Sequence, residues 1–331
     1  MKRWIGALVA LALLAAGGCE PGKKAKNPSG LFVIVQNEQD GYIDKEGKVV
    51  IPPQFDIAYG FTEGLAVVQM GPRFGYIDEE GRYVVNPQYE DAFSFYEGLA
   101  AVKTGGRVGY IDEEGKMVIP PQFDQAGDFS GGLARVVIAG RTGYIDHEGR
   151  LKINPRFQEG RKFSEGLAAV AVDGKWGYID DEGEMVITLQ FDEVLDFSEG
   201  LALVRIASKY GFIGKDGKFE INPRFDNGYS FSEGLATVGT GDRGGYIDKD
   251  GEVAIPIQYE SVAPFSEGMA RVKIGGRWGY IDKEGKVVIN PQYDKAFDFN
   301  GGLAQVGIGE KDDEAFGYID REGKMVWQPS R

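Results

Sequence analysis

The sequence predicts an all-β protein built from tandem repeats, and two observations carry this prediction. A motif that reads Gly-Tyr-Ile-Asp at residues 41–44 returns along the chain, and its opening glycine falls at positions 41, 75, 109, 143, 177, 211, 245, 279 and 317. Glycine accounts for 50 of the 331 residues, and most glycines keep fixed places in this 34-residue period. Because repeat units stack on their neighbours, the period decides the fold class before any local pattern does.

The second repeat unit shows how each unit is expected to fold. Three segments are rich in apolar and β-branched residues, which predicts three short strands at residues 64–69, 74–78 and 82–85. Asp78 and Gly81 predict the turn between the last two strands, since aspartate opens a type I turn and glycine takes the left-handed position after it. Pro87 ends the third strand because it has no backbone donor. Each unit is therefore predicted to be a three-stranded antiparallel meander followed by a loop.

The pattern of apolar residues indicates how the units pack together. Tyr76-Ile77 and Val84-Val85 are pairs of adjacent apolar residues whose side chains point to opposite faces of a sheet, so both faces need covering by neighbouring units. One loop position is always phenylalanine, and we expect it in the contact between units: Phe61, Phe95, Phe129, Phe163, Phe197, Phe231, Phe265 and Phe299.

Nine such units, from about residue 30 to residue 328, fit two architectures. The sheets could stack as an open β-superhelix or close as a propeller-like ring. Propeller blades usually have four strands and about 40–45 residues, and this chain shows no split unit whose halves could join its ends. The sequence therefore favours the open superhelix, with the closed ring as the alternative.

The N-terminal segment resembles a bacterial lipoprotein signal. Lys2 and Arg3 precede an apolar run over residues 4–16, which is too short to span a membrane but fits a signal peptide. The run ends in Ala-Gly-Gly-Cys, and by resemblance to a lipobox Cys19 becomes the lipidated first residue of an exported, envelope-anchored protein. The alternative is an ordinary secretory signal, which would leave the protein secreted.

Three segments follow from this interpretation. We expect a signal peptide over residues 1–18, and a lipidated cysteine with a flexible tether rich in Pro, Gly, Lys and Ser over residues 19–29. A single repeat domain is expected over residues 30–331.

Composition argues against several classes of function. The formal net charge of −14 is unsuited to binding a phosphate backbone, so no nucleic-acid partner is expected. Cys19 is the only cysteine and His147 the only histidine, so neither a histidine-based triad nor a soft-metal site can be built. His147 itself is expected to be a solvated turn residue. No cofactor and no metal site is predicted.

Two of the repeats carry a recognisable family motif. Trp176-Gly177-Tyr178-Ile179-Asp180 and Trp278-Gly279-Tyr280-Ile281-Asp282 resemble the WG (Trp-Gly) repeats of bacterial proteins, and the resemblance covers about 300 residues. Tryptophan precedes the glycine only in these two units. The resemblance implies a β-structured interaction module, often exported, and it brings no catalytic residue with it.

Two features break the repetition and are therefore candidates for function. The residue before each repeat glycine, here called the pre-glycine position, varies, and its aromatic members form a candidate surface for stacking on sugar rings or holding a peptide: Phe74, Trp176, Tyr210, Trp278 and Phe316. The alternative is that these rings pack between units. The second feature is a four-residue acidic insertion within residues 309–315, which is either a contact loop or a tolerated surface insertion.

The expected function is a binding or scaffold module for an envelope protein or a cell-wall glycan, without catalysis. One alternative is a glycan hydrolase with a carboxylate pair, and another is a passive spacer. Most aspartates recur at equivalent turn positions, which favours a role in turns, whereas a catalytic site is usually singular. A cluster of close carboxylates away from the turns would favour the hydrolase.

Overall fold

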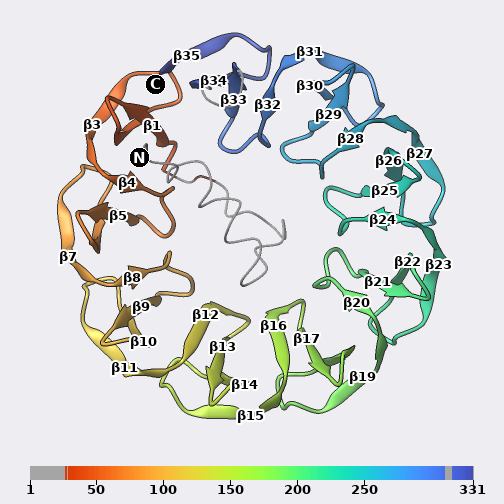
Figure 1. The fold of residues 1–331 in the computed structure, drawn as a ribbon, viewed down its shortest axis with the longest axis horizontal. Helices are drawn as coiled ribbons and strands as arrows, with labels where there is room; N and C mark the ends of the chain where they lie inside the picture. Colours follow the sequence, from red (N-terminus) through yellow and green to blue (C-terminus); the bar gives the residue numbers. More distant parts are fainter. Residues whose placement is uncertain (1–26, 28, 310–314, 331) are drawn as a thin grey trace.

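The computed structural model describes Asn27, residues 29–309 and residues 315–330. These residues form nine antiparallel sheets arranged as blades around a central axis, so the protein is a nine-bladed β-propeller (Figure 1). The first blade has three strands and the other eight have four. In the described part of the chain, no helix is long and apolar enough to cross a membrane.

Blade 2 shows the plan of a blade. Its strands are β4 (Ile57–Ala58), β5 (Ala66–Met70), β6 (Arg73–Ile77) and β7 (Tyr83–Tyr89), and they pair in that order. The β4 strand lies nearest the centre of the ring and β7 lies at the rim (Figure 1). The three longer strands confirm the predicted meander. The sequence missed the fourth strand, because two residues within a loop carry no strand pattern.

The same plan repeats around the ring. Blade 1 consists of β1 (Phe32–Gln36), β2 (Gln39–Ile43) and β3 (Val49–Phe55). The inner strands of blades 3 to 9 are β8 (Asp91–Ala92), β12 (Gln125–Ser130), β16 (Glu159–Ser164), β20 (Glu193–Val194), β24 (Asn227–Gly228), β28 (Ser261–Val262) and β32 (Lys295–Ala296). The second strands are β9 (Ala100–Thr104), β13 (Leu133–Ile138), β17 (Leu167–Val172), β21 (Ala202–Ile206), β25 (Ala236–Thr240), β29 (Ala270–Ile274) and β33 (Ala304–Ile308).

The third and outer strands complete these blades. The third strands are β10 (Arg107–Ile111), β14 (Arg141–Ile145), β18 (Lys175–Ile179), β22 (Lys209–Ile213), β26 (Arg243–Ile247), β30 (Arg277–Ile281) and β34 (Ala315–Ile319). The outer strands are β11 (Met117–Phe123), β15 (Leu151–Phe157), β19 (Met185–Phe191), β23 (Phe219–Phe225), β27 (Val253–Tyr259), β31 (Val287–Tyr293) and β35 (Met325–Ser330).

The ring is closed, so the prediction of an open superhelix was wrong and its alternative is confirmed. Phe32 and Ile34 of blade 1 share one apolar cluster with Leu303 and Tyr318 of blade 9. The rings of Phe32 and Tyr318 meet edge to face, with centroids 5.5 Å apart. Two physical reasons explain the error. The loop supplies the fourth strand that a blade needs, and side-chain packing joins the ends without a split blade.

The apolar core lies between blades. Val67 and Tyr76 of blade 2, for example, pack with Phe95, Ala100 and Val102 of blade 3. Both faces of each sheet are therefore covered, as the paired apolar residues predicted. The Tyr76 and Phe95 rings lie 5.0 Å apart, and Phe95 is fully buried. The phenylalanine position thus lies in the contact between blades, as expected.

A tyrosine hydroxyl links most blades to the next one. Each donates to a backbone carbonyl 17 residues further along, at 2.7–2.8 Å: Tyr42 to Tyr59, Tyr76 to Phe93, Tyr110 to Gly127, Tyr144 to Arg161, Tyr178 to Leu195, Tyr246 to Ala263 and Tyr280 to Phe297. Blade 6 carries Phe212 at this place and cannot donate. The contact between blades 6 and 7 therefore lacks this bond.

Carboxylates also serve structural roles, in two sets. In the turns, Asp78 accepts the backbone N–H of Arg82 at 2.8 Å and Gly81 has a φ of 79°, which confirms the predicted turn chemistry. Between blades, Glu165 accepts the N–H groups of Glu199 and Gly200 at 2.6 and 3.0 Å. Equivalent bonds recur around the ring. Most of the aspartates in the turns and of the glutamates between blades therefore stabilise the fold.

Candidate binding groove

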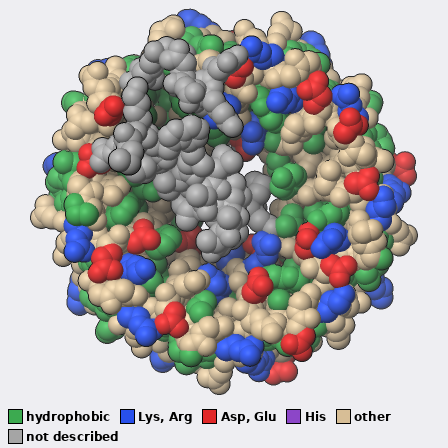
Figure 2. Space-filling model, viewed as in Figure 1, with side chains coloured by type: hydrophobic (Ala, Val, Ile, Leu, Met, Phe, Trp, Pro, Cys, Tyr) green, Lys and Arg blue, Asp and Glu red, His purple; other side chains and the backbone are tan. Residues whose placement is uncertain are grey.

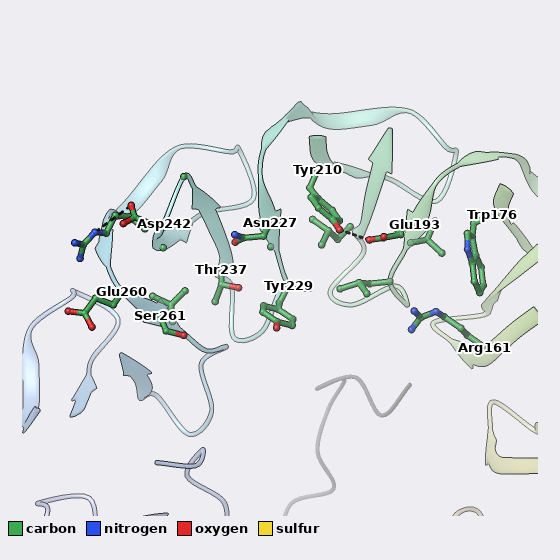
Figure 3. Close-up of a pocket in the computed structure, with 18 residues that line it drawn as sticks. Arg161, Trp176, Glu193, Tyr210, Asn227, Tyr229, Thr237, Asp242, Glu260 and Ser261 are labelled. Carbon is green, nitrogen blue, oxygen red and sulfur yellow. Dashed lines mark hydrogen bonds and ion pairs between the residues drawn. The ribbon is translucent and has the colours of Figure 1, made fainter. Parts of the chain in front are cut away.

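A groove of about 680 Å³ runs along the arc of blades 5 to 8 (Figure 3). Trp176 and Glu193 lie at one end of it, Tyr210 and Thr237 in the middle, and Ser261 near the other end. The inner strands β20, β24 and β28 and the hairpin between β25 and β26 supply much of its lining. Four consecutive blades therefore contribute to a single concave site.

The groove brings together two of the five predicted aromatic residues. Trp176 and Tyr210 line it, whereas Phe74, Trp278 and Phe316 are not among its lining residues. All five side chains are half-buried. The sequence alone could not show which two of the five aromatic residues line the same groove.

Cations cover several of these rings. The guanidinium carbon of Arg161 lies 5.6 Å from the centroid of the Trp176 ring, and that of Arg271 lies 5.2 Å from the Trp278 ring. Lys295 is 5.6 Å from the centroid of the Phe316 ring. In each of these contacts the cation and the ring belong to the same blade, and Trp176 and Tyr210 also line the groove.

Tyr210, Glu193 and Arg205 form a hydrogen-bonded group in blade 6. The Tyr210 hydroxyl donates to one oxygen of Glu193, and Nη2 of Arg205 donates to the other at 2.7 Å. Burial and the bond to Glu193 raise the pKa of Tyr210 to about 12. Tyr210 therefore stays a neutral phenol at physiological pH, and its ring is held by Glu193.

Thr237 is a buried polar residue that the sequence analysis missed. Its side chain is only 1% exposed, and within the described residues its Oγ1 has no hydrogen-bond partner. The equivalent position holds an apolar side chain in several blades, such as Val67, Ala101 and Leu203, and an arginine in blades 4 and 8, Arg135 and Arg271. An unpaired buried hydroxyl costs about 1–3 kcal/mol, so a hydrogen bond from a water molecule or from a polar ligand group would stabilise this atom beside the groove.

Gly244 is the second residue that the sequence analysis missed. It occupies the pre-glycine position of blade 7 and lines the groove. A Cβ at Gly244 would lie 2.7 Å from Cγ2 of Val262, so the methyl groups of Val262 fill part of the space that a side chain holds elsewhere. The available signal was that Gly244 is the one glycine among the nine pre-glycine residues.

The carboxylates of the groove do not form an isolated pair. Glu193 is bound by Tyr210 and Arg205, as described above. Glu260 accepts the backbone N–H groups of Gly275 and Gly276 at 2.8 and 3.0 Å. The side chain of Asp242 is 92% exposed. Across the described ranges, no group of three or more His, Cys, Asp and Glu side chains could hold a metal ion.

His147 differs from its expected solvated position. Its ring stacks on Phe129 at 4.2 Å, and its Nε2 lies 3.5 Å from a carboxylate oxygen of Glu97 in the preceding blade. Lysines at the equivalent turn position make the same contact, as Lys215 does with Glu165 at 3.5 Å. His147 is therefore a contact between blades, which the sequence missed because that contact is not local.

Two predicted features fall outside the described residues. Cys19, with its proposed lipid anchor, precedes the described ranges, and residues 310–314 of the acidic insertion lie in the gap between them.

Comparison with known proteins supports the repeat and the fold. Eight segments match the family described as WG containing repeat: residues 41–71, 74–107, 109–141, 143–176, 176–210, 210–243, 245–278 and 278–311. No curated protein matches the chain.

Two solved structures are similar in fold. One is the crystal structure of a eukaryotic initiation factor, with 12% identity and a TM-score of 0.64 over 91% of this chain and 97% of that one. Another is dihydro-heme d1 dehydrogenase NirN in complex with DHE, with 12% identity and a TM-score of 0.51 over 96% of this chain and 76% of that one. At these identities the similarity concerns the fold alone.

Proposed function

The chain belongs to the family of proteins with WG-containing repeats, and we propose that it is a noncatalytic module that binds a cell-envelope glycan in the groove of blades 5 to 8. The observation that carries this proposal is the meeting of Trp176, Tyr210 and the unpaired Thr237 hydroxyl in one concavity. A binding site of this kind combines apolar and aromatic walls with a few placed polar groups.

The chemistry of the lining fits a sugar chain. A pyranose ring has apolar C–H faces and a rim of hydroxyl groups. The rings of Trp176 and Tyr210 offer apolar surface, while Asn227, Thr237 and Ser261 offer amide and hydroxyl groups along the same groove (Figure 3). This mixture suits a glycan better than a purely apolar ligand.

The charges favour a ligand without strong net charge. Arg161 and Arg243 line the groove together with Glu193, Asp242 and Glu260, so both signs are present in nearly equal number. Acidic and basic side chains are also interspersed over the face seen in Figure 2. A polyanion would meet no basic stripe in this lining.

The absence of catalysis in this proposal rests on the carboxylates. Hydrolysis of a glycosidic bond usually needs two carboxyl groups facing the scissile bond. In the groove, Glu193 is bound to Tyr210 and Arg205, and Glu260 is bound to two backbone N–H groups.

The cellular setting is part of the proposal and rests on the N-terminal sequence. Residues 1–18 as a signal peptide and Cys19 as a lipid anchor would place the groove outside the cytoplasm. The cell wall and other envelope glycans would then be within reach. Acyl-chain analysis of Cys19 by mass spectrometry tests this part separately, and an unmodified cysteine in the membrane fraction would contradict it.

The binding proposal is tested by cosedimentation of the purified protein with insoluble cell-wall glycan. We expect Trp176→Ala to reduce the bound fraction about tenfold, because it removes an aromatic wall of the groove. Trp278→Ala is the matched control, since Trp278 holds the same position in blade 8 but does not line the groove. Circular dichroism checks that both variants fold.

Each outcome has a definite meaning. Loss of binding in Trp176→Ala alone supports the groove as the site. Equal binding by the wild type and both variants places the site elsewhere and overturns the proposal. Capture of an envelope protein together with no sedimentation on glycan would also overturn it, in favour of the protein-binding alternative.

A further inference from the structure

We infer that Tyr229 is the main stacking surface of the groove, where it holds one uncharged sugar ring of the ligand, and that Asn227 bonds the polar rim of that ring. The inference rests on the proposed function and adds to it the position and the chemical character of one subsite. It is carried by the exposure of Tyr229 and by the small residues beside it on blade 7.

Tyr229 is the most accessible aromatic side chain of the groove. It is 48% exposed, whereas Trp176 and Tyr210 are half-buried. It directly follows the inner strand β24 and lies in the middle of the groove, between Glu193 and Ser261 (Figure 3). A ligand in the groove can therefore reach this ring without any rearrangement of the blades.

In two other blades the residue that corresponds to Tyr229 packs with the pre-glycine side chain. The ring of Phe297 in blade 9 lies 6.1 Å from that of Phe316. In blade 2, Tyr59 and Phe74 pack against the same apolar cluster. Blade 7 has a glycine at the pre-glycine position, and its tyrosine is not part of the described cluster between blades 7 and 8. The missing side chain therefore explains why this ring is exposed.

A second glycine extends the gap. Gly239 of β25 pairs with Asn227 on one side and with Gly244 on the other, so the three residues form a row across blade 7. No other blade has glycine at both of the last two positions. Val262 of blade 8 fills the space beside Gly244, and Tyr229 is 48% exposed with this valine in place. The accessible surface is thus the tyrosine ring, and not the glycine backbone.

Asn227 supplies the polar partner. A Cβ at Gly228 would face Leu203 of blade 6, so Asn227 and Tyr229, on either side of Gly228, face the opposite way. The Asn227 amide lies over Gly239, so close that a Cβ there would overlap it. An amide offers both a donor and an acceptor, which hydroxyl or acetamido groups at the rim of a sugar ring can bond.

The charged side chains favour an uncharged sugar. Glu193, Asp242 and Glu260 line the groove together with Arg161 and Arg243, so carboxylates outnumber guanidinium groups. Arg243 also lies 3.8 Å from Asp242, which takes up part of its charge. A uronic acid on the ring would therefore meet more repulsion than attraction along the groove.

The test is calorimetric titration of the purified protein with defined oligosaccharides. The neutral members are oligomers of β-1,4-linked glucose, β-1,4-linked N-acetylglucosamine and α-linked mannose, each of two to six units, and oligogalacturonate is the anionic member. Tyr229→Ala removes the ring, and Tyr229→Phe keeps the ring without its hydroxyl. Tyr59→Ala is the matched control, because Tyr59 holds the same position in blade 2, outside the groove. Trp176→Ala tests the proposed function on the same panel.

A double variant restores the cover that this ring lacks. Gly244→Phe with Val262→Ala reproduces the set of Tyr59, Phe74 and Ala92 in blades 2 and 3, and the alanine makes room for the new ring. Its matched comparison is Gly244→Ala with Val262→Ala, which has the same backbone change without a ring. Thermal melts check that each variant folds.

We expect a neutral oligomer to bind the wild type, and Tyr229→Ala to weaken its affinity about tenfold or more. Tyr229→Phe should lose less affinity than Tyr229→Ala, because the stacking surface remains. Tyr59→Ala should bind as the wild type does. The double variant with phenylalanine should bind about tenfold more weakly than the double variant with alanine, because its ring covers Tyr229.

The outcomes separate this inference from the proposed function. If Trp176→Ala loses binding while Tyr229→Ala keeps it, the subsite inference fails and the proposed function stands. Equal affinities of the two double variants, or tighter binding of oligogalacturonate than of every neutral oligomer, would also overturn the inference. If no neutral oligomer binds, the inference fails, and cosedimentation with cell-wall glycan decides the proposed function on its own. If Trp176→Ala and Tyr229→Ala both bind as the wild type does, both proposals fail.

Discussion

The hydroxyl of Tyr318 donates a hydrogen bond to the backbone carbonyl of Val33 at 2.8 Å, across the contact between the last blade and the first. Tyr318 occupies the repeat position from which seven other tyrosines bind the next blade, so the ring closes with the same bond that joins its interior blades. Nearby, the backbone N–H of Asn27 donates to the side chain of Asn300 at 2.9 Å.

This bond predicts that the closing contact is as strong as an interior one. Tyr318→Phe should lower the free energy of unfolding by about 1 kcal/mol, because it leaves a carbonyl without its donor. Tyr178→Phe, which removes the equivalent bond to Leu195, is the matched comparison. Chemical denaturation measures both, and a loss confined to Tyr178→Phe would show that the ring is open in solution.

Replacing Phe212 by tyrosine, which adds the hydroxyl that blade 6 lacks, should stabilise the protein. Phe212 holds the tyrosine position in blade 6 and meets Phe231 at 4.9 Å with an angle of 63°, the geometry of the Tyr–Phe pairs elsewhere. Phe212→Tyr would place a hydroxyl near the carbonyl of Tyr229, and we expect a gain of about 1 kcal/mol. A loss of stability on denaturation would show that the contact between blades 6 and 7 differs from the others.

A glutamate in left-handed conformation gives a third prediction. Glu165 has a φ of 55°, and its carboxylate binds two N–H groups of the next blade. Glu165→Ala should cost about 2–3 kcal/mol, because it removes these bonds and keeps an unfavourable φ. Glu165→Gly should cost about 1 kcal/mol less, since glycine tolerates this φ.

Blade 4 already has a glycine at the position that Glu165 holds in blade 5. Gly131 occupies the same repeat position in blade 4 with a φ of 65°. Equal losses in the alanine and glycine variants, measured by urea denaturation, would mean that the φ contributes nothing to the cost.

Asp128 makes stability depend on pH. Burial raises its pKa from 3.8 to about 6, against the opposing charge of Lys162. A carboxyl group with a raised pKa in the folded state contributes stability below about pH 3.8, and this contribution is lost as the pH rises through about 6. Asp128→Asn should therefore gain about 2 kcal/mol relative to the wild type between pH 4.5 and pH 8.

Thermal or urea unfolding at the two pH values measures this effect. Lys162→Gln should move the sensitive range to higher pH, since it removes the charge that favours the carboxylate. An equal effect of Asp128→Asn at both pH values would show that the carboxyl group is hydrated in the folded protein.

Most of the blade could be predicted from the sequence because its determinants are local. Short runs of apolar and β-branched residues predict the strands, and the Asp78–Gly81 turn is set by the left-handed φ that Gly81 adopts. The buried Phe95 was predictable as well, since its position is phenylalanine in eight units. The fourth strand was not, because Ile57–Ala58 forms a strand only through pairing with Val68 and Gln69.

Some residues of the candidate site could likewise be found from the sequence, and others only from the structure. Trp176 and Tyr210 stood out as irregular residues in a regular repeat, so sequence comparison within the chain found them. Thr237 did not stand out, because the absence of a partner for its hydroxyl is a property of the packing around it. Which aromatic residues share a groove also depends on side chains from four blades.

The sequence by itself determined the all-β class, the nine units and the turn chemistry, because each depends on residues close together in the chain. The tertiary structure alone decided that the ring closes and that Gly244 and Thr237 border one groove. Closure depends on the sum of small rotations between successive blades, and the groove depends on which side chains are missing where blades meet. Neither quantity is encoded in any single repeat.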